Sequence, residues 1–133
     1  MEKRVFRSKI VYWVSIIYFS LITLISFTAS FSFFNTSFNL FRFILLISFS
    51  IFSLIVCISL FEKAKHTVIL INIYTSILII LIIFQLLKNH FEYHIYYNSQ
   101  VYFLIFLVIF LMSINIFKYN SKKYKEIDEI GKQ

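Results

Sequence analysis

The chain contains no proline, a single glycine and a single cysteine, and only 14% of its 133 residues are charged. Helices broken at mid-membrane, which form many transporter substrate sites, are disfavoured in a chain with so little glycine and proline. A single cysteine excludes an intramolecular disulfide. The low charge content also excludes an ordinary soluble domain, in which about a quarter of the residues are charged.

Long uncharged apolar stretches take the place of these residues. Residues 68–87 read VILINIYTSILIILIIFQLL and contain no charge. As a helix rising about 1.5 Å per residue, this stretch matches the ~30 Å hydrocarbon core of a bilayer. Three further stretches resemble it, so the sequence predicts an all-α integral membrane bundle of four transmembrane helices. The predicted spans cover about residues 10–34, 43–61, 68–87 and 101–117.

The predicted membrane domain, residues 10–117, lies between a basic segment, 1–9, and a charged tail, 118–133. Ser8 and Thr67 are suited to cap the helices that follow them. The loop between the second and third spans is so short that these spans must be antiparallel neighbours. A secretory signal peptide is the alternative for the first span, but its apolar core is typically 7–15 residues and this run is longer.

The distribution of lysine and arginine predicts the orientation. Eleven of the thirteen basic residues fall on one side of the predicted membrane, and only Arg42 and Lys88 fall on the other. By the positive-inside rule both termini are then cytoplasmic in a multi-pass protein of the cell membrane. Attraction to anionic lipid accounts for the net charge of +7 without nucleic-acid binding. The eleven residues are Lys3, Arg4, Arg7, Lys9, Lys63, Lys65, Lys118, Lys122, Lys123, Lys125 and Lys132.

The predicted spans contain no Asp, Glu, Lys, Arg or His. Proton-coupled transporters and pumps depend on ionisable groups inside the membrane. Small multidrug transporters resemble this chain in outline, with four spans at a similar length. Their hallmark is an acidic residue in the first span. The first span of this chain has no acidic residue and offers only serine, threonine and aromatic side chains in its place. The resemblance therefore fails at the residue that transport requires.

His90 and His94 are four residues apart and would share one face of a helix, with Glu92 nearby. Zinc sites usually have three or four ligands, and no third histidine lies on that side. The alternative is an amphipathic belt of His, Tyr and Phe at the headgroup level. We favour the belt and expect no metal site, no cofactor and no catalytic residue, because no nucleophile–base pair is recognisable.

Small polar residues recur at helical spacing in the first two spans. In the absence of glycine, serine is the small residue that allows membrane helices to approach closely. A packing seam between helices is the first interpretation, and a polar pathway for an ion or solute is the second. The two stripes are Thr23, Ser26 and Ser30 in the first span and Ser50, Ser53 and Cys57 in the second.

Two asparagines provide the most specific packing prediction. Asn72 lies near the start of the third span and Asn115 near the end of the fourth, so antiparallel helices place them at similar depth. An amide facing lipid is costly, so we expect the two to contact each other inside the bundle. Ser15 and Cys57 enter at comparable depth, which predicts one polar layer. The alternative is that Asn115 extends to the interface alone.

The sequence therefore favours a non-catalytic accessory or interaction protein of a membrane complex. Its expected partners are the bilayer itself, with anionic lipid at the cytoplasmic face, and another membrane protein or a second copy of the chain. A small oligomeric channel or holin-like pore is the alternative, since a pore without charged rings can gate by a hydrophobic constriction.

Overall fold

The computed structural model describes residues 5–32, 39–93 and 98–118. Within these residues the secondary structure is helical, and the only extended pairing is an isolated bridge between Phe6 and Lys118. The four helices are α1 (Lys9–Ser32), α2 (Leu40–Phe61), α3 (Thr67–Tyr93) and α4 (Asn98–Phe117). All four are long and apolar enough to cross a membrane, as a multi-pass membrane protein requires.

The helices extend beyond some of the predicted spans. α2 begins at Leu40 because Asn39 caps it, its Oδ1 accepting from the Phe41 and Arg42 amides at 3.1 and 3.4 Å. Arg42 therefore lies in the first turn of α2 and not in the preceding loop. α3 continues past Lys88 to Tyr93, giving 27 residues and a length of about 40 Å. The extension of α2 adds one cation, Arg42, and that of α3 adds the polar residues Lys88, Asn89 and His90.

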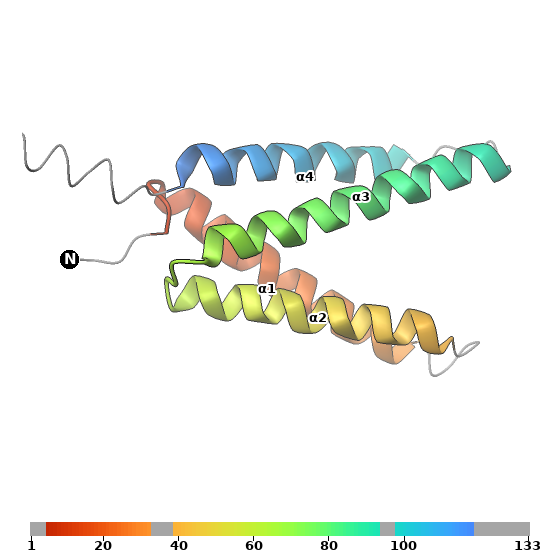
Figure 1. The fold of residues 1–133 in the computed structure, drawn as a ribbon, viewed down its shortest axis with the longest axis horizontal. Coiled ribbons are helices and arrows are strands. Elements are labelled where there is room, and N and C mark those ends of the chain that lie inside the picture. Colours follow the sequence, from red (N-terminus) through yellow and green to blue (C-terminus); the bar gives the residue numbers. More distant parts are fainter. Residues whose placement is uncertain (1–4, 33–38, 94–97, 119–133) are drawn as a thin grey trace, which may run out of the picture.

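Two helical hairpins form the bundle. α1 packs most extensively along α2, and α3 along α4, whereas α1 makes few contacts with α4. The hairpins approach each other at the end that carries the 62–66 loop and the last turn of α4, and diverge toward the opposite end (Figure 1). We call the first the packed end and the second the open end.

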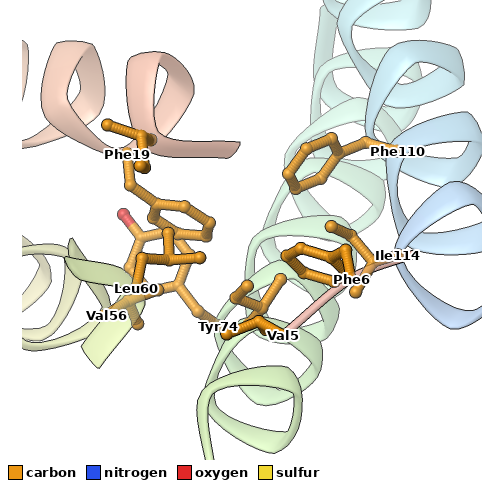
Figure 2. Close-up of a cluster of buried hydrophobic side chains, with 10 residues drawn as sticks. Val5, Phe6, Phe19, Val56, Leu60, Tyr74, Phe110 and Ile114 are labelled. Atoms are coloured by element: carbon orange, nitrogen blue, oxygen red, sulfur yellow. The ribbon is translucent and has the colours of Figure 1, made fainter. Parts of the chain in front are cut away.

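The buried apolar side chains gather toward the packed end, and Figure 2 shows part of this cluster. Phe19 of α1, Leu60 of α2, Tyr74 of α3 and Ile114 of α4 are each at most 1% exposed. The Tyr74 ring is the centre of an aromatic cluster, with the ring centroids of Phe19 and Phe52 at 5.4 and 5.3 Å. Such edge-to-face pairs add to the packing. In residues 24–32, 40–49, 76–91 and 98–106, toward the open end, only Ser30 is buried.

The turn between the hairpins is a Schellman motif built without glycine. The Ala64 amide donates to the Ser59 carbonyl at 3.0 Å, and the Lys63 amide to the Leu60 carbonyl at 3.2 Å. Lys63 has a φ of 51°, a left-handed conformation that glycine adopts at less cost. Thr67 does not act as an accepting cap: its hydroxyl donates to the Ser59 and Ala64 carbonyls at 2.9 and 2.8 Å.

Candidate functional site

The two asparagines are joined by a reciprocal pair of hydrogen bonds. Asn72 Nδ2 donates to Asn115 Oδ1 at 2.9 Å, and Asn115 Nδ2 donates to Asn72 Oδ1 at 3.1 Å. Asn115 Nδ2 also donates to the Leu111 carbonyl of its own helix at 2.9 Å. This contact was predicted from the similar depth of the two residues. Because two hydrogen bonds join Asn72 of α3 to Asn115 of α4, the pair fixes the register of α3 against α4.

Ser15 and Cys57 have other partners. The Ser15 hydroxyl donates to the Val11 carbonyl of α1 at 2.7 Å, and Cys57 Sγ lies 3.4 Å from the Ser20 hydroxyl. Among the described residues, neither is hydrogen bonded to an asparagine. The polar layer is thus divided, with the asparagine pair in the second hairpin and these two residues in the first.

Hydroxyl groups connect α1 to α2 along the seam that their small residues predict. Thr23 Oγ1 lies 2.8 Å from Ser53 Oγ, and the Ser50 hydroxyl lies 3.5 Å from the Thr23 carbonyl. Nearer the packed end, the Tyr12 hydroxyl donates to the Leu60 carbonyl at 3.1 Å. Because small side chains let the two backbones approach, the hydroxyls contact each other across the interface.

The lysines and arginines among the described residues lie mostly at one end of the bundle, as their distribution in the sequence predicts. Arg7 and Lys9 lie at the start of α1, Lys63 and Lys65 in the turn between hairpins, and Lys118 directly after α4. All five are at the packed end, whereas Arg42 and Lys88 lie toward the open end (Figure 1). The other predicted membrane-surface residues lie outside the described residues: Lys3, Arg4, Lys122, Lys123 and Lys125.

The histidine pair falls partly outside the described region. His90 lies in the last part of α3, while His94 is not among the described residues. In residues 5–32, 39–93 and 98–118 no three of His, Cys, Asp and Glu gather in a way that would hold a metal ion. The two-histidine alternative includes His94 and therefore lies outside the described residues.

The segment that precedes α1 packs into the bundle, which its sequence does not predict. Val5 and Phe6, predicted to be part of a basic flank, are 7% and 4% exposed and belong to the core cluster. The Arg7 amide donates to the Phe117 carbonyl at 2.8 Å, next to the bridge between Phe6 and Lys118. The available signal was an apolar pair between cations, which a charge count does not register.

Comparison of the chain with protein-family models, with curated protein sequences and with solved structures found no match.

Proposed function

We propose that the chain is a small, non-catalytic accessory or interaction protein of a membrane complex, which works through the faces of its helices. One observation supports this most directly: toward the open end the hairpins diverge, and large apolar side chains of all four helices stay exposed. Lipid covers such faces in a free protein, and the helices of a partner would cover them in a complex.

The polar chemistry of the bundle supports the same proposal. The asparagine amides bond each other, and the Thr23 and Ser53 hydroxyls bond each other. None of the predicted spans carries an ionisable side chain apart from Cys57 and the tyrosines. A pump or proton-coupled transporter needs such groups within the membrane, whereas a protein that binds other helices needs none.

The test is purification in mild detergent, with a photo-crosslinking amino acid placed at Phe84. This side chain is 67% exposed on α3 toward the open end. We expect one membrane protein to copurify in fixed ratio and to crosslink at this position. The matched control is the same amino acid at Ile116, which is 69% exposed at the packed end and should crosslink less. A preparation with no partner, or equal crosslinking at both positions, contradicts the proposal.

We further propose that the packed end faces the cytoplasm and that anionic lipid binds its cations in the cell membrane. The support is the gathering of Arg7, Lys9, Lys63, Lys65 and Lys118 at this end, since each basic residue near an anionic surface contributes about 1 kcal/mol. Reporter domains fused after Phe34, Phe61, Lys88 and Gln133 test the orientation. We expect the Phe61 and Gln133 fusions to report cytoplasm, and the opposite pattern contradicts the proposal.

A small oligomeric channel or holin-like pore is the second candidate. The observation in its favour is a pair of buried hydroxyls, Tyr18 Oη and Thr75 Oγ1, that have no hydrogen-bond partner among the described residues. Buried groups of this kind are usually satisfied by water or by another protein group. A pure homo-oligomer that conducts ions in liposomes would favour the pore. If a Tyr18→Phe, Thr75→Val variant still conducts, the two hydroxyls do not line the ion pathway.

A further inference from the structure

The hydroxyl of Thr75 is buried in the bundle without a partner on its own helix. Thr75 is fully buried on the face of α3 that also carries Ile71 and Tyr74 of the core cluster. In α1, Thr23 and Thr28 donate to the carbonyls four residues before them at 2.7 and 2.9 Å, which is the usual bond of a threonine inside a helix. Thr75 Oγ1 makes no such bond. Its hydroxyl is therefore available to a partner in the interior of the bundle.

A second buried hydroxyl comes from α1. Tyr18 Oη is shielded from solvent and has no hydrogen-bond partner within the part of the chain that the structure describes. The ring that carries it packs against α4, with the ring centroids of Phe106 and Phe110 at 5.6 and 4.7 Å. These contacts hold the ring in place but offer its hydroxyl only apolar neighbours.

The two hydroxyls belong to different hairpins and lie at similar depth. α1 and α3 both run from the packed end toward the open end (Figure 1). Tyr18 and Thr75 each lie about 12–14 Å along their helices from Lys9 and Thr67, the first residues, which is near the middle of the ~30 Å hydrocarbon core. The residues next to them, Phe19 and Tyr74, have ring centroids 5.4 Å apart, so α1 and α3 face each other at this depth.

A water molecule has the chemistry to satisfy both hydroxyls. It can accept a hydrogen bond from one hydroxyl and donate to the other, and buried waters typically bond to about 2–4 polar groups that lack protein partners. Immobilising one water costs little, whereas a buried hydroxyl without a partner bears its full desolvation penalty.

We propose that a water molecule is held between Tyr18 and Thr75 and bridges the two hairpins in the middle of the membrane. The Thr23–Ser53 contact lies within the first hairpin and the asparagine pair within the second, whereas this water joins one hairpin to the other. A single held water requires neither ion conduction nor a partner protein. The inference is therefore independent of the functions proposed above.

The site is tested by NMR transfer of magnetisation from water to threonine methyl groups, with the full chain in nanodiscs of deuterated lipid. Only the methyl groups of the five threonines are protonated. Thr75 should receive magnetisation from water although its side chain is fully buried. Thr23 is the matched control and should receive less, because its hydroxyl already bonds the Phe19 carbonyl. Transfer at Thr75 that is no stronger than at Thr23 overturns the proposal.

Tyr18→Phe distinguishes a bridging water from exchange of the Thr75 hydroxyl proton with solvent. The variant keeps the ring and the Thr75 hydroxyl but removes one of the two groups that hold the water. Transfer to the Thr75 methyl should be lost, while the signals of the other threonines confirm that the variant is folded. Transfer that persists at full strength in the folded variant overturns the bridge.

A double-mutant cycle of Tyr18→Phe and Thr75→Val, measured by unfolding in SDS mixed micelles, provides a readout without labels. Each change alone should lower the ratio of folded to unfolded protein by about three-fold, the effect of a typical membrane hydrogen bond. The double variant should lose no more than either single one, because both changes remove the same water. In the control cycle, Tyr18→Phe with Thr23→Val, the two losses should multiply. Single variants that are more stable than the unaltered chain would show that the hydroxyls are dry, and losses that multiply in both cycles would show that they share no partner; either result overturns the proposal.

Discussion

The packed end and the open end of this bundle have nearly the same apolar composition but differ in how their helices meet. At the packed end, side chains from all four helices and from Val5 and Phe6, which precede α1, form one buried cluster. Toward the open end, Phe27, Phe84 and Tyr102 are 54%, 67% and 70% exposed on helices that diverge. Hydrophobicity alone therefore does not explain where the helices associate.

Polar contacts between elements mark the difference. The packed half contains the asparagine pair, the Tyr12–Leu60 bond and the bonds of Thr67 across the turn. Toward the open end, the hydroxyls of Thr28, Ser32 and Ser48 bond carbonyls of their own helices. Because lipid solvates apolar faces as well as another helix does, close packing and interhelical hydrogen bonds decide which faces join.

The largest expected difference between the two ends is the cost of removing an aromatic ring. Phe19 is fully buried and contacts the rings of Tyr74 and Phe110, so Phe19→Ala should destabilise the protein by about 3–5 kcal/mol. Phe84→Ala at the open end should change stability by less than about 0.5 kcal/mol. Unfolding by SDS titration in mixed micelles measures both. Similar losses would mean that the open end is packed in the folded protein.

Next in size is the coupling within the asparagine pair. A double-mutant cycle of Asn72→Ala and Asn115→Ala should show coupling of about 1 kcal/mol, within the ~0.6–1.7 kcal/mol found for membrane hydrogen bonds, because two bonds join the amides. The control cycle pairs Asn72→Ala with Ser113→Ala, whose hydroxyl bonds its own helix at 2.8 Å. Equal coupling in both cycles would show that the pair has no special contribution.

The turn offers a stabilising change. Lys63→Gly should stabilise the protein by about 0.4–1 kcal/mol, because glycine adopts the positive φ at this position without a steric cost. Lys65→Gly removes the same charge from the same loop at a residue without a positive φ, and it should give no gain. The same SDS titration compares the two variants. If both stabilise equally, relief of charge repulsion and not backbone conformation is the cause.

The smallest effect is expected at the α1–α2 seam. Ser50→Ala removes only a long hydrogen bond across the seam, 3.5 Å from the Ser50 hydroxyl to the Thr23 carbonyl. We expect a loss of about 0.6 kcal/mol or less. Ser48→Ala, an exposed hydroxyl bonded to its own helix, is the control and should have no measurable effect. A loss above about 2 kcal/mol at Ser50 would indicate that the seam is a main source of stability.

The uncharged apolar runs were enough to predict that the membrane domain is helical and roughly where the four helices of the described residues lie. Uncharged apolar runs of membrane length can only satisfy their backbone groups as helices or closed barrels, and these runs are twice the length of a membrane strand. The Asn72–Asn115 contact was also predictable, because two amides at one depth in antiparallel neighbours have few alternatives to each other. Only part of the expected polar layer followed, since Ser15 satisfies its hydroxyl within α1.

Where the two hairpins pack together, and which side chains fill the contact between them, depends on helices that are distant in the sequence. Large apolar side chains lie on exposed as well as buried faces of these helices, so hydrophobic periodicity does not reveal which face meets another helix. The bridge between Phe6 and Lys118 joins residues that are far apart in the sequence, and no local pattern encodes such a pairing. The divergence of the hairpins likewise follows from the fit of side chains across four helices, which a one-dimensional pattern does not contain.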